Sequence, residues 1–151
     1  MSLAVDVSAD DVRTSVGRAR VAEIARTTLK SERIRNALLS VTFVSRRAIA
    51  RLNRTHLAHP GPTDVISFGF VRATPDDPVI GDIYICPEIA RQNARAHGTP
   101  VREELARLIV HGVLHVLGHD HPDGDDVVRE GSEMWRKQER IVRRVVGAAG
   151  G

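Results

Sequence analysis

The run from His111 to His121, His-Gly-Val-Leu-His-Val-Leu-Gly-His-Asp-His, is the feature that most constrains this chain. His111 and His115 are four residues apart, so in a helix they project from the same side, one turn from each other. Gly118 can take the positive φ that ends a helix and turns the chain back, which would bring His121 toward the same point. The run therefore predicts a helix whose end presents three imidazoles to one ion at about 2 Å, with a coordination position left for water.

The alternative is a polar helix end on which the histidines fall by chance. Four of the seven histidines of the chain lie in this run, and two of them interrupt an otherwise apolar helix, where an unligated imidazole costs free energy. A structural zinc site is more often closed by cysteines, and the chain has only Cys86. We therefore expect one zinc-type ion at a catalytic site formed by His111, His115 and His121. Nickel or cobalt could substitute, because imidazole ligands discriminate weakly among these ions.

One position of the run excludes a familiar chemistry. The spacing matches every His and Gly of the metzincin peptidase pattern, His-x-x-x-His-x-x-Gly-x-x-His. Those peptidases carry a general-base Glu directly after the first His, and this chain has Gly112 there. The metal geometry is kept, whereas the proton shuttle of peptide hydrolysis is missing.

Two further blocks accompany the run, Pro-Thr-Asp-Val-Ile-Ser-Phe at 62–68 and Gly-Asp-Ile-Tyr-Ile-Cys-Pro-Glu at 81–88. Together the three segments resemble the signatures of the YbeY family, bacterial rRNA maturation factors that act as metal-dependent single-strand endoribonucleases. His119 stands where the family usually has Tyr. His56 and Leu57 stand where many members carry an aromatic residue followed by an Arg that is thought to serve RNA processing.

The resemblance covers the chain from about Leu38 to the C-terminal helix and carries several implications. It implies a zincin-like α+β fold and a cytoplasmic endoribonuclease that matures the 3′ end of small-subunit rRNA and takes part in ribosome quality control. Single-stranded RNA, rRNA and the small ribosomal subunit would be its partners. The family also places the strand bordered by Thr63, Asp64 and Ser67 beside the metal cleft, although alone these residues would indicate a turn and a strand end.

Two residues are further candidates for catalysis. Asp120 lies between expected ligands and could orient one of them through its free ring N–H, or it could be a solvent-facing turn residue. Because Leu57 replaces the family's Arg, Arg54 is the nearest candidate to contact the scissile phosphate, one turn earlier on the same expected helix. Arg51 is second, and a solvated surface charge is the alternative for both. The ion would act as a Lewis acid or lower the pKa of a bound water, and either this water or the RNA 2′-hydroxyl could attack.

Length and composition fit one intracellular domain over residues 1–151. The single cysteine provides no disulfide framework, residues 1–12 lack the pattern of a signal peptide, and no stretch approaches the roughly 18 apolar residues of a membrane span. The net charge is +3, and 20 of the 22 basic residues are Arg, which suits phosphate but also follows from a GC-rich genome. With three Phe, one Tyr and one Trp, RNA recognition through phosphates and shape is favoured over base stacking.

Hydrophobic periodicity and punctuating Gly and Pro predict alternating helices and strands. Helices are expected from Ser8 to about Lys30 with Asp11 as a cap partner, over 45–56, from Pro87 to Gly98, from a Thr99 cap through the first two histidines, and from about Asp125 onward. Strands are expected over 39–43, 65–70 and 79–86. We expect a single α+β domain with a mixed sheet of about four strands covered by helices, in which Cys86 is a small buried side chain and Trp135 packs in the core.

Three functions are compatible with these features. The first is an endoribonuclease that acts on rRNA. The second is a metallohydrolase of another class, such as an unusual peptidase or amidohydrolase, because the same three ligands can support either. The third is a non-catalytic ribosome-associated factor in which the metal only stabilises the fold. Incubation with labelled RNA and with peptides separates the first two, and a folded, metal-free variant that still supports ribosome maturation would favour the third.

Overall fold

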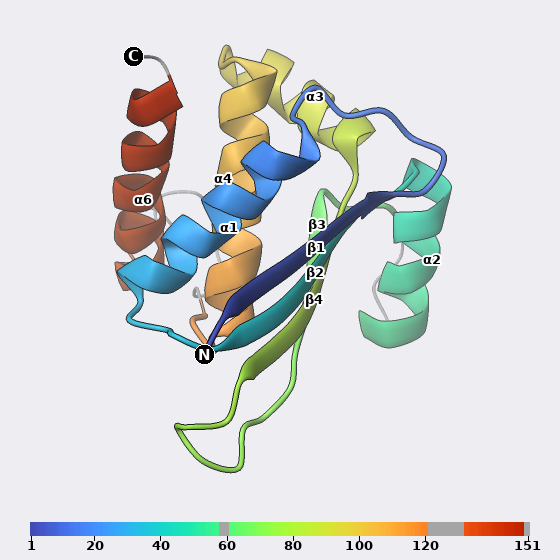
Figure 1. The fold of residues 1–151 in the computed structure, drawn as a ribbon. Helices are drawn as coiled ribbons and strands as arrows, with labels where there is room; N and C mark the ends of the chain where they lie inside the picture. The colour runs from blue at the N-terminus through green and yellow to red at the C-terminus, as the bar shows by residue number, and fades with distance from the viewer. Residues whose placement is uncertain (58–60, 121–131, 150–151) are drawn as a thin grey trace.

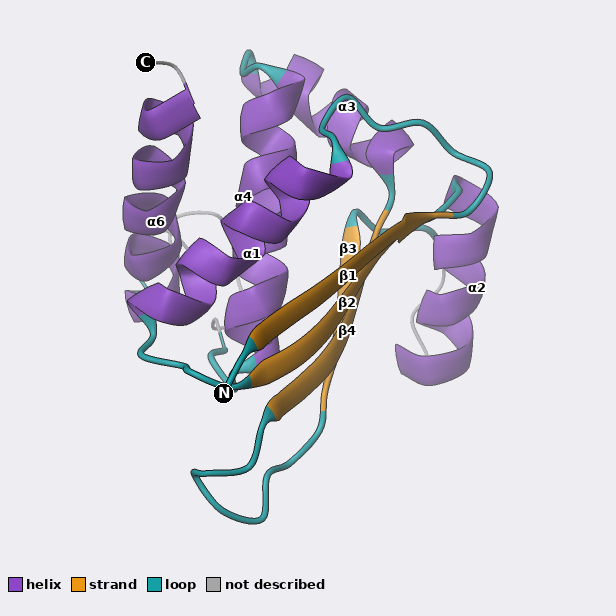
Figure 2. Ribbon diagram, viewed as in Figure 1, coloured by secondary structure: helices purple, strands orange, loops and turns teal. Residues whose placement is uncertain are grey.

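A computed structural model describes residues 1–57, 61–120 and 132–149, in which a four-stranded sheet carries helices on both faces (Figures 1 and 2). The strands are β1 (Leu3–Ala9), β2 (Ala37–Phe43), β3 (Val65–Gly69) and β4 (Val79–Ile85), and the helices are α1 (Arg18–Ser31), α2 (Arg46–Leu57), α3 (Pro87–His97), α4 (Val101–Val116) and α6 (Glu133–Ala149). The strand order is β1-β2-β4-β3, with β3 antiparallel to β4 and the other pairs parallel. The predicted α+β fold with a mixed sheet is confirmed.

The N-terminal segment differs from the prediction. A helix was expected from Ser8, but β1 runs to Ala9 and α1 begins only at Arg18. β1 pairs in parallel with β2 along its whole length, so its backbone groups are satisfied by a strand far along the chain, which a local pattern does not reveal. Asp11 has a φ of 55°, which no helix interior accommodates. The prediction of a helix opened by Ser8 and Asp11 was therefore wrong.

The start of α4 also differs from the prediction. Thr99 does not cap the helix, because Pro100 occupies the N-cap position and Val101 is the first helical residue. Pro100 has a ψ of 144°, an extended rather than a helical value, so Thr99 lies one residue before the N-cap. Its buried Oγ1 has no hydrogen-bond partner among the described residues. The start predicted near Asp125 for the last helix lies outside the described residues.

The core lies on both faces of the sheet. The larger hydrophobic cluster joins one face to α1, α4 and α6, and a smaller cluster joins the other face to α2 (Figure 1). Cys86 is fully buried in the smaller cluster, which confirms the prediction of a small buried side chain. α4 is the central helix, because it packs against three helices and two strands. None of the described helices has the length and hydropathy needed to cross a membrane.

Glycines set how closely α4 approaches the sheet. A Cβ on Gly112 would lie 2.8 Å from Cγ2 of Ile83 and 3.1 Å from Oγ of Ser67. At the end of the helix, a Cβ on Gly69 would lie 2.7 Å from the backbone oxygen of Val116. The distances from these added Cβ atoms to Ile83 and Val116 are shorter than packed atoms allow. The observed packing of α4 on β3 and β4 therefore requires glycine at positions 69 and 112.

Replacing Gly112 by Ala should therefore destabilise the protein. The added methyl group meets the β-branched side chain of Ile83, which is stiff, and such overpacking costs about 1–3 kcal/mol. This cost exceeds the roughly 1 kcal/mol that helix propensity gives to Ala over Gly. Urea unfolding of the metal-free protein measures the difference.

Gly147→Ala is the matched control. Gly147 lies in α6, and no described atom is within 4 Å of a Cβ built there, so only the propensity gain should remain. If Gly112→Ala proved as stable as wild type while Gly147→Ala behaved as expected, the close approach of α4 would be contradicted.

Candidate metal and catalytic site

The last turns of α4 bring two of the three predicted metal ligands together. The rings of His111 and His115 have centroids 4.5 Å apart and planes inclined by 76°. Both side chains are partly buried. After the helix ends, Gly118 takes a φ of 95°, the positive value that the sequence predicts. The third predicted ligand, His121, lies outside the described residues.

The donors present fit a nitrogen-ligated metal centre. Two imidazoles one turn apart on a rigid helix are the arrangement with which zinc-type sites commonly begin. Within residues 1–57, 61–120 and 132–149 no group of three His, Cys, Asp or Glu side chains could hold an ion, and the predicted third ligand, His121, lies outside these residues. Cys86 is no rival ligand to His111 and His115, since it is packed in the smaller cluster beneath α2, on the opposite face of the sheet.

A row of polar contacts connects the histidine pair to α6. Nδ1 of His111 lies 2.7 Å from Oε1 of Gln138, a side chain that is only 6% exposed. Nε2 of Gln138 donates to Oε2 of Glu139 at 3.1 Å. Arg107, one turn before His111 on α4, donates to both carboxylate oxygens of Glu139 at 2.9 Å. Four side chains from two helices thus form one connected set.

The charges at the far end of this row are paired. Burial raises the pKa of Glu139, but the hydrogen bonds from Arg107 and Gln138 and the positive charge of Arg107 outweigh it and hold the pKa below its usual value. The hydrogen bond to Glu139 likewise raises the pKa of Arg107. Both groups are therefore charged at neutral pH, and the two-pronged pairing fixes their geometry.

Two further carboxylates, one buried at Glu104 and one partly buried at Asp64, also have raised pKa values. Glu104 is 4% exposed, and its Oε2 has no hydrogen-bond partner among the described residues, although Nη1 of Arg107 is 3.6 Å away. Burial raises the pKa of Glu104 against the opposing charges of Arg107 and His97. Asp64 accepts a hydrogen bond from Asn93 at 3.1 Å, and burial raises its pKa as well.

The 62–68 block leads into β3, which packs against the helix that carries the histidines. Ser67 points toward α4, where its Oγ would meet a Cβ on Gly112 at 3.1 Å. Thr63 instead lies beside Asp64, with its Oγ1 3.4 Å from Oδ1 of that carboxylate. Ser67 thus lies beside Gly112, the residue after His111, and the expectation that this strand borders a metal cleft stays a prediction.

The other two candidates, Arg54 and Asp120, lie at exposed positions. Arg54 is exposed on α2, on the sheet face opposite α4, and its contact with phosphate stays a prediction. Asp120 is exposed just beyond Gly118, and its role in orienting a ligand also stays a prediction. His119, the residue that replaces the family's Tyr, contacts Oε1 of Glu32, which Lys137 also approaches at 3.1 Å. This cluster ties the chain just before His121 to α1 and α6.

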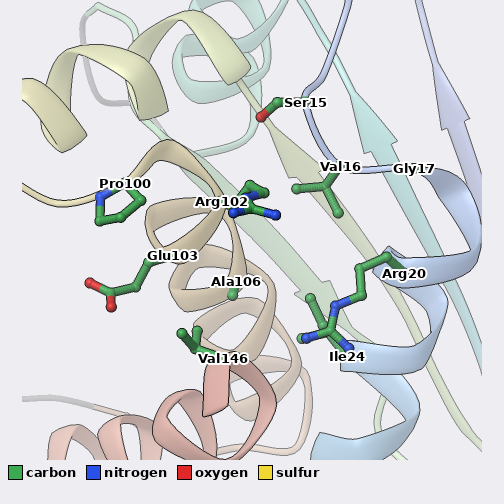
Figure 3. A pocket seen from close by; sticks show the side chains of 10 residues that line it. All are labelled: Ser15, Val16, Gly17, Arg20, Ile24, Pro100, Arg102, Glu103, Ala106 and Val146. Carbon is green, nitrogen blue, oxygen red and sulfur yellow. The ribbon is translucent and has the colours of Figure 1, made fainter. Parts of the chain in front are cut away.

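A pocket of about 360 Å³ lies at the other end of α4, where α1, α4 and α6 meet (Figure 3). Arg20, Arg102, Glu103 and Val146 are among its lining residues. Arg20 is already engaged, because it donates to a backbone oxygen of α6 and pairs with Glu23. Arg102 precedes the histidine pair by about 2.5 to 3.6 helical turns, a separation of about 14–20 Å. The pocket is therefore not part of the histidine site.

Gln138 is the functional candidate that was not recognised in the sequence. It lies between Met134 and Ile141 in the buried row of α6. The signal was present, since a Gln in an otherwise apolar row must find a hydrogen-bond partner when it is buried. The partner could not be identified, because no local pattern shows that α6 packs against α4.

The fold and the site define a class of protein, the α+β hydrolases in which a central helix presents a His-x-x-x-His pair beside a mixed sheet. The family model described as Endoribonuclease YbeY matches residues 5–146. The chain therefore belongs to the YbeY family of endoribonucleases, which are hydrolases that act on RNA.

Individual relatives agree with this assignment. The chain is 34% identical to Endoribonuclease YbeY of Frankia alni, over 99% of this chain and 88% of the relative. It is 37% identical to Endoribonuclease YbeY of Acidothermus cellulolyticus, over 90% and 94%. The solution structure of TM1509 from Thermotoga maritima superimposes with a TM-score of 0.62 and 26% identity, covering 97% of this chain and 91% of that one.

Replacing Glu104 by Gln should change how stability depends on pH. Because burial raises the folded-state pKa of Glu104 above its usual value of 4.5, the folded protein binds more protons than the unfolded chain above pH 4.5. The free energy of unfolding of the wild-type protein therefore falls as the pH rises above 4.5. The Glu104→Gln protein lacks this titration, so its free energy of unfolding should rise relative to wild type between pH 4.5 and neutrality.

Urea unfolding at a series of pH values measures this effect. Glu103→Gln is the control, since it removes a more exposed carboxylate that lies 3.6 Å from the same Arg107. A difference between Glu104→Gln and wild type that stayed constant with pH would show that burial of the charge is not the cause.

Proposed function

We propose that this endoribonuclease cleaves single-stranded RNA in rRNA maturation with one zinc-type ion held by His111, His115 and His121. The observation that carries the proposal is the histidine pair itself, two rings with centroids 4.5 Å apart on a helix that is largely buried. A buried, rigid helix keeps ligand positions fixed better than a loop does. Membership of the endoribonuclease family supplies the RNA substrate.

The chain's own residues define how such a site would work. A bound ion would supply Lewis-acid stabilisation of a phosphoryl oxygen and a lowered pKa for a bound water. His111 and His115 would each contribute one nitrogen from α4. Gly112 contributes no carboxylate, so the proton of the attacking group must leave by a route other than the peptidase Glu. Asp120, beside His121, is proposed to orient a ligand ring.

The packing argues against a peptidase of the usual kind. In such an enzyme the residue after the first His carries the general base, and here even a Cβ at Gly112 would meet Ile83 at 2.8 Å. The position is filled by the sheet rather than by a reactive group. We therefore favour RNA cleavage over peptide hydrolysis. We further propose that the protein acts in the cytoplasm with the small ribosomal subunit as its partner.

Ala replacement of each ligand tests the metal site. Wild-type protein loaded with zinc should hold about one equivalent and cleave labelled single-stranded RNA faster than peptides. His111→Ala, His115→Ala and His121→Ala should each lose the metal and the cleavage together, because three ligands and a water leave no spare position. Elemental analysis after dialysis and gel assays of the RNA give the two readouts.

His56→Ala and His97→Ala are controls that should keep both metal and activity, since neither lies in the run. Full metal occupancy in two of the three ligand variants would overturn the site. Faster cleavage of peptides than of RNA at equal metal loading would overturn the activity.

Arg54 is proposed to contact the RNA phosphate in place of the Arg absent at Leu57. Arg54→Ala should weaken binding of single-stranded RNA across sequences and reduce its salt dependence by roughly one contact, without loss of metal. Leu57→Arg should restore part of the affinity. An unchanged affinity and salt dependence in Arg54→Ala, measured by fluorescence anisotropy at several salt concentrations, would exclude the role.

A further inference from the structure

The geometry points to Gln138 as a positioning residue that holds the His111 ring in the tautomer able to bind a metal through Nε2. Its Oε1 lies 2.7 Å from Nδ1 of His111, a short distance for a hydrogen bond between neutral groups. This inference rests on the proposed metal site, in which His111 is a ligand. It gives α6 a part in the site that its sequence alone did not indicate.

The chemistry of the imidazole makes the identity of the Gln138 atom decisive. A neutral imidazole carries one N–H and one lone pair, and the two nitrogens can exchange these roles. The carbonyl oxygen of a side-chain amide can only accept a hydrogen bond, so Nδ1 of His111 must donate to Oε1 of Gln138. The lone pair then resides on Nε2, and Nε2 becomes the nitrogen that can ligate.

The neighbours of Gln138 fix which way round its amide lies. A rotation of the amide by half a turn would present its NH₂ group to His111 and require the opposite tautomer. The carboxylate of Glu139 prevents this, because Oε2 accepts a hydrogen bond from Nε2 of Gln138 at 3.1 Å and would repel an amide oxygen. Glu139 is fixed in turn by two hydrogen bonds from Arg107 at 2.9 Å. The Arg107–Glu139 pair thus fixes the orientation of the Gln138 amide, and this amide fixes the tautomer of the His111 ring.

Burial makes the contact hard to replace. Gln138 is 6% exposed, so bulk water has little access to the position of its amide. Losing the acceptor would leave a donor of His111 unsatisfied in a confined place, or would favour the tautomer whose lone pair is on Nδ1. Partners of this kind on metal-bound histidines alter metal affinity by about 10–100-fold when they are removed.

Three variants of the full-length protein test the role. Gln138→Met keeps the length of the side chain but removes the strong acceptor. Gln138→Glu keeps an oxygen acceptor, whether it is ionised or shares a proton with Glu139. Arg140→Met, on the exposed side of α6, controls for a change of charge and helix propensity. Zinc affinity is measured by competition with a chelator, and urea unfolding of the metal-free proteins reports structural damage separately.

We expect about 10–100-fold weaker zinc binding in Gln138→Met and at least wild-type affinity in Gln138→Glu and Arg140→Met. Long-range ¹H–¹⁵N spectra of the metal-free protein, at a pH where the ring is neutral, should show the His111 proton on Nδ1 in wild type. In Gln138→Met this preference should be lost. The spectra do not depend on metal binding, so they test the tautomer directly.

Other outcomes would overturn the inference and are distinguishable from failure of the metal site. If wild-type protein binds zinc through His111 but Gln138→Met binds it within threefold of wild type, Gln138 has no positioning role while the site stands. Equal losses of affinity in Gln138→Met and Gln138→Glu would mean that Gln138 acts through packing alone. A wild-type His111 protonated on Nε2 would contradict the tautomer. Failure of wild-type protein to bind zinc, or undiminished binding in His111→Ala, would overturn the metal site itself.

Discussion

The contact between α4 and the sheet is the constraint on which the rest of the structure depends. Gly112 and Gly69 let the helix lie so close to β3 and β4 that a single added carbon would meet Ile83 or the backbone of Val116. This approach buries one side of α4 against the sheet, while His111 faces Gln138 of α6. The same glycine that permits the contact removes the catalytic carboxylate of a peptidase, so packing and chemical class are linked at Gly112.

The other side of α4 is organised by charge. Arg107 lies between Glu104, Glu103 and Glu139, and its bidentate pair with Glu139 connects α4 to α6. Buried ion pairs of this kind add little net stability, because desolvation offsets their attraction. Their value here is geometric, since an ordered Glu139 orders the amide of Gln138, and the amide faces a predicted ligand. The Arg107–Glu139 pair therefore lies beside the predicted metal site, where the orientation of the Gln138 amide depends on it.

Much of the fold could be predicted from local patterns, and the failures share a physical cause. The alternation of Leu39, Val41 and Phe43 indicated β2, and Gly98 marked the end of α3 with a φ of 66°. β1 was missed because a parallel strand is stabilised by a partner far along the chain. In the site, the pairing of His111 with His115 follows from helix periodicity, whereas the contact with Gln138 joins residues 27 positions apart. Sequence spacing finds groups on one helix and cannot find those that tertiary packing brings together.

We propose that α4 presents its histidines as nitrogen ligands to one metal ion in an endoribonuclease. X-ray absorption at the zinc edge of the metal-loaded protein tests it most directly, because the spectrum reports the type and distance of the ligands. We expect three imidazole nitrogens at about 2.0–2.1 Å and one further oxygen. A sulfur ligand at about 2.3 Å, which only Cys86 or a methionine could provide, or a spectrum without imidazole scattering, would contradict it.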